Sequence, residues 1–142
     1  MKRIVLCLVA VVAASSISVQ SAFAVKAFGE AFAERYNLIE PKTDAEKSLA
    51  AAVKEAKCTL CHGEKSKKVR NEYGQALAEL LDKSDYGAKR RKDEPEAVQK
   101  ELFEAFDKVA KEKSESGQTF GEKIAEGKLP AAEGTDSKED ED

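Results

Sequence analysis

Four to five short helices in an all-α fold are predicted for this chain of 142 residues. Apolar side chains recur every three or four residues in several stretches, as they do on a helix that buries one face. Two sequences of the form Thr-x-x-Glu, at 43–46 and 119–122, match the capping box that begins many helices. No stretch of strand length alternates between apolar and polar residues, so the pattern gives no support to a β-sheet.

The first 24 residues are typical of a secretory signal peptide that is removed during export. Lys2 and Arg3 precede an apolar run over 4–19, and the Ala-Phe-Ala sequence at 22–24 matches a cleavage site. An uncleaved membrane anchor is the alternative, but the run is short for the roughly 20 residues that span a bilayer. We therefore expect a periplasmic or otherwise extracytoplasmic protein that begins at Val25 and keeps no stable membrane anchor.

Two helices are expected before the centre of the chain. Residues 27–36 place Phe28, Phe32 and Tyr36 on one stripe. We interpret this stripe as packing on the domain, with a lid over a bound group as the alternative. The first capping box then begins a helix over 44–57 with a face of small and apolar residues. This second helix would deliver the chain directly to a pair of cysteines.

Two further helices are expected in the second half of the chain. Asn71 is a candidate N-cap for a helix to about residue 82, after a polar and basic segment at 64–70. Residues 84–92, which include a second basic cluster, are expected to form a loop. Acidic residues and Pro95 then begin the strongest helix, which should reach about residue 113. Its predicted apolar face consists of Val98, Leu102, Ala105, Phe106 and Val109.

A short fifth helix and an acidic tail are expected at the C-terminal end. The second capping box begins the helix, which should stop at Gly127. Residues 131–142 hold six acidic side chains against the single Lys138 and lack large apolar groups, so this tail should be disordered. The expected organisation is therefore a signal peptide at 1–24, one domain at 25–130 and the tail at 131–142.

Charge is concentrated in the tail rather than over the domain. The formal net charge of the whole chain is −3. The acidic tail and the basic residues of the signal peptide account for this charge, which leaves 25–130 near neutrality. A nucleic-acid-binding domain normally carries a clear excess of lysine and arginine. We therefore expect no nucleic-acid partner.

The most specific motif in the chain is Cys-Thr-Leu-Cys-His at 58–62, the attachment signature of c-type haem. In that chemistry the thiols of Cys58 and Cys61 add across the two vinyl groups of the porphyrin, and His62 supplies an axial nitrogen to the iron. A zinc site would need two further ligands, but Cys7 is the only other cysteine and His62 the only histidine. A thioredoxin-like redox pair is also disfavoured, because no βαβ pattern surrounds the motif.

The motif and the helix before it resemble those of monohaem class I c-type cytochromes. In that family a helix leads to the motif, with a small residue eight positions before the first cysteine, where this chain has Ala50. The aromatic residue often found four positions before that cysteine is replaced by Lys54. The resemblance implies helices wrapped around one covalently attached haem c, held by Cys58 and Cys61. It also implies His62 as an iron ligand, and haem attachment outside the cytoplasm.

The second axial ligand is the main departure from this family. Class I cytochromes use methionine, and many others use histidine, but the only methionine here is Met1, in the signal peptide. The segment at 127–130 is similar to the one that carries the methionine, with Leu129 in its place. The alternatives are an empty or water-filled position, another chain, the amino group of Val25, or a side chain such as Lys128 or Tyr73.

Two functions are consistent with these expectations. The first is a one-electron carrier or redox subunit, which needs an unidentified redox partner and would use the charged clusters to steer docking. The second is a haem-based sensor or binding protein that takes a diatomic gas, nitric oxide or carbon monoxide, at an open iron. A peroxidase-like enzyme is disfavoured because no distal histidine is present for acid–base catalysis, so we do not predict an enzyme.

Overall fold

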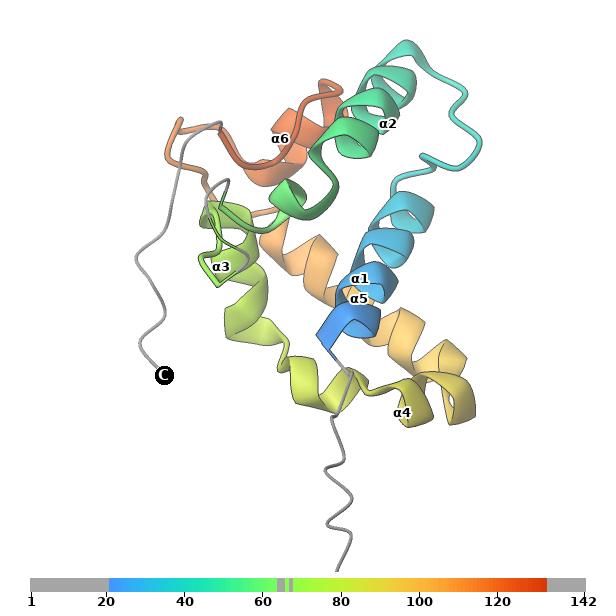
Figure 1. Ribbon diagram of the computed structural model, residues 1–142. Coiled ribbons are helices and arrows are strands. Elements are labelled where there is room, and N and C mark those ends of the chain that lie inside the picture. The colour runs from blue at the N-terminus through green and yellow to red at the C-terminus, as the bar shows by residue number, and fades with distance from the viewer. Residues whose placement is uncertain (1–20, 64–65, 67, 133–142) are drawn as a thin grey trace, which may run out of the picture.

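The computed structural model describes residues 21–63, 66 and 68–132 (Figure 1). These residues contain six α-helices and two short 3-10 helices. In chain order they are α1 (Ser21–Arg35), α2 (Asp44–Ala56), η1 (Lys57–Leu60), α3 (Glu72–Leu80), η2 (Lys83–Tyr86), α4 (Ala88–Asp93), α5 (Pro95–Val109) and α6 (Phe120–Ala125). The all-α class is confirmed, whereas the expected number of four to five helices is too low. Most of the expected signal peptide and tail lies outside the described residues.

The core lies where α1 packs across α5 (Figure 1). Phe32 of α1 and Phe106 of α5 are each 1% exposed, and their rings meet edge to face with centroids 5.8 Å apart. Phe28 and Tyr36 also pack against this core, which confirms the interpretation of their stripe as packing. The five residues predicted for the apolar face of α5 are all buried. Burial of each large apolar side chain stabilises the fold by about 1.5–3 kcal/mol.

Both predicted capping boxes are confirmed. At the start of α2, the Thr43 hydroxyl accepts a hydrogen bond from the Glu46 N–H at 3.1 Å, and the Glu46 carboxylate accepts one from the Thr43 N–H at 2.8 Å. At the start of α6, Thr119 and Glu122 form the same pair of bonds, at 3.1 and 2.7 Å. Each box pairs two N–H groups that a helix start would otherwise leave exposed.

The expected loop at 84–92 is wrong, because this segment contains the end of η2 and most of α4. Alanine, lysine and arginine have high helix propensity, and three of the four basic residues of α4 lie in its last turn, where the helix dipole favours positive charge. The contact with α5 fixes this short helix, because Arg90 Nη2 donates to Glu101 Oε1 at 2.6 Å. The basic cluster is therefore a structural element rather than a solvated loop.

Two helices end earlier than expected, α3 at Leu80 and α5 at Val109. After α5 the chain folds back on itself, because the Gly121 N–H donates to the Ala110 carbonyl at 2.8 Å. A Cβ on Gly121 would also lie 2.8 Å from that oxygen, so a larger residue does not fit without movement. This close return sets the position of α6 against the end of α5.

A buried ion pair joins α6 to α3. Lys123 Nζ lies 3.8 Å from Glu72 Oε1, and the two side chains are only 8% and 9% exposed. The Glu72 carboxylate also accepts hydrogen bonds from the N–H groups of Glu115 at 2.6 Å and Ala132 at 2.9 Å. One carboxylate therefore holds together the start of α3, the connection from α5 to α6 and the last described residues.

Candidate haem-attachment site

The Cys58–His62 segment begins at a sharp change in chain direction. α2 ends at Ala56, and Lys57, the next residue, adopts a φ of +51°. Few residues other than glycine adopt this left-handed conformation, and such strain is found preferentially at functional sites. The turn places η1 between α2 and the start of α3 (Figure 1).

The five residues of the motif form one compact turn. The N–H groups of Cys61 and His62 both donate to the carbonyl of Cys58, at 3.4 and 3.1 Å. Side chains three positions apart on such a turn lie on the same side of it. The turn therefore places Cys58 and Cys61 on one side, with His62 directly after them. A pair of thioether bonds to the neighbouring vinyl groups of one porphyrin requires this arrangement.

Both cysteines are free thiols and partly buried. Burial and the neighbouring Cys58 raise the pKa of the Cys61 thiol to about 12. The thiol rather than the thiolate is therefore the form of Cys61 at neutral pH, which makes it a poor nucleophile. The two thiols are close enough to interact and are not joined in a disulfide.

Asn71 holds the motif from the side of α3. Its buried side-chain amide donates to the carbonyls of Thr59 at 2.8 Å and Leu60 at 3.1 Å. Its side-chain oxygen accepts from the Gly74 N–H at 2.9 Å, which confirms the predicted N-cap. The Asn71 N–H donates to the Cys61 carbonyl at 3.2 Å. A single asparagine thus caps α3 and fixes the backbone of the motif.

The first turn of α3 lies directly on the motif. A Cβ added to Gly74 would be 1.8 Å from the Cys61 carbonyl oxygen, so no side chain fits at this position. The backbone also returns beside the motif after the following loop, because the Gly63 N–H donates to the Val69 carbonyl at 2.9 Å. The expected basic loop at 64–70 contributes this return, although residues 64, 65 and 67 lie outside the described part.

An aromatic cluster lies next to the motif. Tyr73 is fully buried at the start of α3, with its ring centroid 6.0 Å from Phe32 of α1 and 5.3 Å from Phe120 of α6. Tyr36, just after α1, lies 4.7 Å from the Phe32 ring. Burial raises the pKa of Tyr36 to about 12 and that of Tyr73 well above its ordinary value. Both phenols are therefore protonated at neutral pH.

The other residues considered as axial ligands lie in different surroundings. Lys128 is on the surface, where Nζ donates to Glu126 Oε2 at 2.6 Å and the side chain is 62% exposed. Leu129 packs partly buried against the core. Val25 lies within α1. Of the two side chains proposed from the sequence, Tyr73 is the one buried beside the motif.

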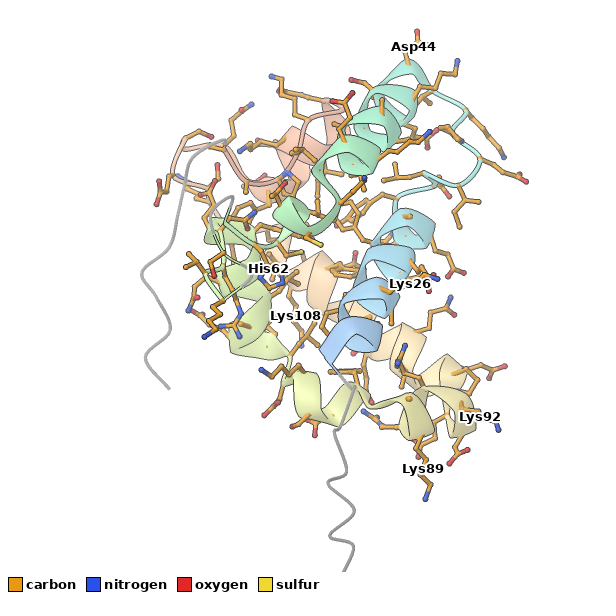
Figure 2. All side chains as sticks on the ribbon, in the orientation of Figure 1. Lys26, Asp44, His62, Lys89, Lys92 and Lys108 are labelled. Carbon is orange, nitrogen blue, oxygen red and sulfur yellow. The ribbon has the colours of Figure 1, made fainter. Side chains whose placement is uncertain are left out.

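The basic cluster on α4 is remote from the motif. Figure 2 shows Lys89 and Lys92 at the far end of the molecule from His62, which lies beside α3. Arg90 of this cluster is engaged by Glu101, and its guanidinium also lies 5.7 Å from the centre of the Tyr86 ring. Docking through α4 would therefore not bring a partner to the Cys58–His62 turn.

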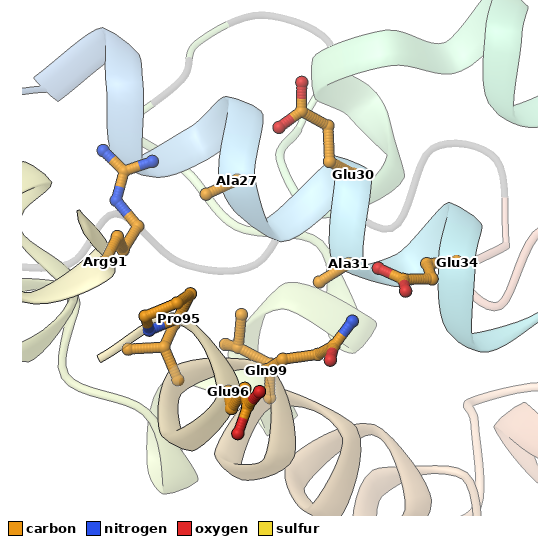
Figure 3. Close-up of a pocket in the computed structure, with 10 residues that line it drawn as sticks. Ala27, Glu30, Ala31, Glu34, Arg91, Pro95, Glu96 and Gln99 are labelled. Atoms are coloured by element: carbon orange, nitrogen blue, oxygen red, sulfur yellow. The ribbon is translucent and has the colours of Figure 1, made fainter. Parts of the chain in front are cut away.

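A shallow pocket of about 260 Å³ lies between α1, α4 and α5 (Figure 3). Its wall includes the charged side chains of Glu30, Glu34, Arg91 and Glu96, and it contains none of the predicted site residues. Ligand pockets are usually larger. This pocket is therefore not the candidate site.

Comparison of the chain with protein-family models, curated proteins and solved structures finds no match. In the described part of the chain, no three histidine, cysteine, aspartate or glutamate side chains form a group that could hold a metal ion. None of the helices described is long and apolar enough to cross a membrane.

Proposed function

We propose that this chain is an exported monohaem protein of the c-type cytochrome kind, which transfers single electrons. The compact turn at Cys58–His62 is the observation that carries the proposal. It brings two free thiols to one side, and the next residue is a histidine. The Cys-x-x-Cys-His signature of c-type haem attachment gives a role to each of these three side chains.

The surroundings of the turn fit a covalently held haem. Asn71 and Gly74 fix the backbone of the motif from α3, and Tyr73 of the same helix lies close enough to Cys61 to interact with it. Cys58 and Cys61 would hold the group, each S–H adding across one vinyl group to form a C–S bond. His62 would bind the iron. When bound, the haem iron supplies a one-electron ferric/ferrous couple.

Export is part of this proposal, with electron transfer to a partner protein in an extracytoplasmic compartment. The basic residues at 2–3, the apolar run and the Ala-Phe-Ala site at 22–24 support it. Electron transfer is preferred to catalysis because the sequence contains no second histidine to act as a distal acid or base.

A second candidate function is the binding of a diatomic gas. It is favoured by the lack of a methionine after Met1 and of a histidine other than His62. It is also favoured by the surface position of Lys128, whose amino group is paired with Glu126. With no strong ligand from these side chains, the iron would have a weakly held or open sixth position.

Optical spectra of the purified, haem-loaded protein distinguish the two functions. A six-coordinate, low-spin spectrum that is unchanged when carbon monoxide is added to the ferrous form supports a dedicated electron carrier. A high-spin spectrum with rapid carbon monoxide binding supports the gas-binding function. A protein that has no haem c absorbance, when a reference cytochrome is loaded under the same conditions, contradicts both.

A further inference from the structure

The segment that follows α6 is fastened first to α2 and then to the start of α3. Gly127 has a φ of +77°, and a Cβ at this position would lie 2.7 Å from the Ala45 carbonyl oxygen. Pro130 is fully buried. The Ala132 N–H then donates to the Glu72 carboxylate at 2.9 Å. The chain therefore enters residues 133–142 from an attachment point on α3.

This attachment point lies beside the Cys58–His62 motif. Glu72 directly follows Asn71, the residue whose side-chain amide holds the backbone of the motif. The Glu115 N–H donates to the same Glu72 carboxylate at 2.6 Å, so the connection between α5 and α6 meets α3 at this point as well. Residues 133–142 therefore start next to both the motif and this connection.

The described surface around the attachment point is basic. Two carboxylates of the connection between α5 and α6, Glu112 and Glu115, are exposed. Glu72 adds little negative charge, because it is paired with the buried Lys123. Four cationic side chains outnumber these groups, and three of the four are exposed. They come from the loop that returns beside the motif and from the connection between α5 and α6, and are Lys68, Arg70, Lys111 and Lys113.

The residues after Ala132 carry the opposite charge. Six of the ten residues at 133–142 are acidic, against the single Lys138. Exposed charges attract one another strongly only within a Debye length, about 8–10 Å at physiological ionic strength. The attachment of Ala132 to Glu72 keeps the first of these acidic residues within that range of the basic surface. A segment tethered in this way has an effective concentration at its target in the millimolar range, about 1 mM or more.

We propose that the part of the acidic tail at 133–142 binds the basic surface of Lys68, Arg70, Lys111 and Lys113 in its own chain. The contact follows from the attachment point and from the two sets of charges, and it does not require haem. Its consequence for electron transfer rests on the proposed function. The tail competes with a partner that has an acidic docking surface, and so slows docking beside the motif at low ionic strength.

The test is the rate of acetylation of individual lysines, measured by mass spectrometry at low ionic strength. The unmodified protein is compared with a variant in which the six acidic residues at 133–142 are replaced by glutamine or asparagine. Only the neutral amine reacts, and nearby carboxylates hold an amine in its charged form. Lys68 and Lys113 should therefore react about threefold or more slowly in the unmodified protein. Lys89 and Lys92 are the matched controls, because they lie at the far end of the molecule from His62 (Figure 2) and should react equally in both proteins.

A second measurement needs no variant. In the unmodified protein, added salt should accelerate acetylation of Lys68 and Lys113 relative to Lys89 and Lys92, because it screens the contact with the tail. Equal rates at Lys68 and Lys113 in the two proteins overturn the inference, as does an equal slowing at Lys89 and Lys92. Protection that grows with protein concentration also overturns it, because the tail would then bind a second copy of the chain.

The fold and the haem are checked separately on the same samples. Circular dichroism should give the same spectrum for the variant and for the unmodified protein, because the substitutions lie beyond the attachment of Ala132 to Glu72. The haem c absorbance is recorded as well. Its absence from the unmodified protein would contradict the proposed haem attachment, whereas the acetylation rates alone decide whether the tail binds the basic surface.

Discussion

Replacement of Asn71 by alanine is the sharpest test of how the motif is held. Alanine removes the N-cap of α3, which typically costs about 1 kcal/mol. It also leaves the buried Leu60 carbonyl without the amide that donates to it at 3.1 Å, which costs about 1–3 kcal/mol. We therefore expect the free energy of unfolding to fall by about 2–4 kcal/mol. In a domain of this size, such a loss lowers Tm by about 10 °C or more.

The assay is thermal and urea unfolding followed by circular dichroism, with two matched variants. Thr43→Ala also removes an N-cap, but it contacts no part of the motif, so it should cost only about 0.5–2 kcal/mol. Asn71→Ser keeps an oxygen that can cap α3 and loses the amide that donates to the motif, so its stability should lie between those of wild type and Asn71→Ala. If Asn71→Ala and Thr43→Ala are equally destabilising, Asn71 does not hold the motif.

Three other outcomes follow from the packing around the site. Glu72→Gln should destabilise the protein by about 3–5 kcal/mol in urea unfolding, because it leaves Lys123 buried without its countercharge, and Glu72→Gln with Lys123→Met should recover part of the loss. Gly74→Ala should lower the free energy of unfolding by about 1–3 kcal/mol or more, since the added Cβ would overlap the Cys61 carbonyl. Gly29→Ala on α1 is the control, because its Cβ meets no atom within 4 Å, and it should be neutral or stabilising by about 0.5–1 kcal/mol. Burial raises the pKa of the Cys61 thiol and so lowers the fraction of reactive thiolate. In the haem-free folded protein, iodoacetamide should therefore modify Cys61 at pH 8 at least about tenfold more slowly than it does in urea. The rate of modification should increase as the pH rises toward 12. Equal rates in the folded and unfolded states would contradict the burial of this thiol.

The helix starts could be predicted from sequence because their signals are local. Thr43, Asn71 and Thr119 each cap a helix within three residues of themselves, and Pro95 occupies the first turn of α5 as expected. Such signals depend on the backbone groups of the same turn and need no tertiary contact. The apolar face of α5 was predictable for the same reason, because its period is that of the helix itself.

The features missed by sequence reasoning depend on contacts between distant segments. α4 was predicted as a loop because its basic residues carry no apolar stripe, and its position depends on the bond from Arg90 to Glu101. Asn71 was identified as a cap, but its bonds to Thr59 and Leu60 require α3 to pack on the motif. The ion pair of Glu72 with Lys123, from α3 and α6, likewise has no local signal.

The residues of the candidate site also fall into those that the local sequence predicts and those that only the fold brings together. Cys58, Cys61 and His62 are contiguous enough for the motif to name them, and the structure adds the turn that aligns the two thiols. Tyr73 was one of several candidates from the sequence, and only the fold places it beside Cys61 rather than at the surface. Tyr36 had no sequence signal beyond its place on an apolar stripe, because its contact with Tyr73 joins α1 to α3 and depends on the fold.

The most direct test of the central claim is the intact mass of the chain after expression with a bacterial haem-attachment system and export. The proposed function predicts a mature chain that begins at Val25 and carries the mass of one haem, retained under denaturing conditions. Replacement of Cys58 and Cys61 by alanine should remove that added mass, whereas Thr59→Ala should keep it. A wild-type chain without the added mass, when a reference cytochrome c is loaded in the same cells, would contradict the claim that this motif holds haem.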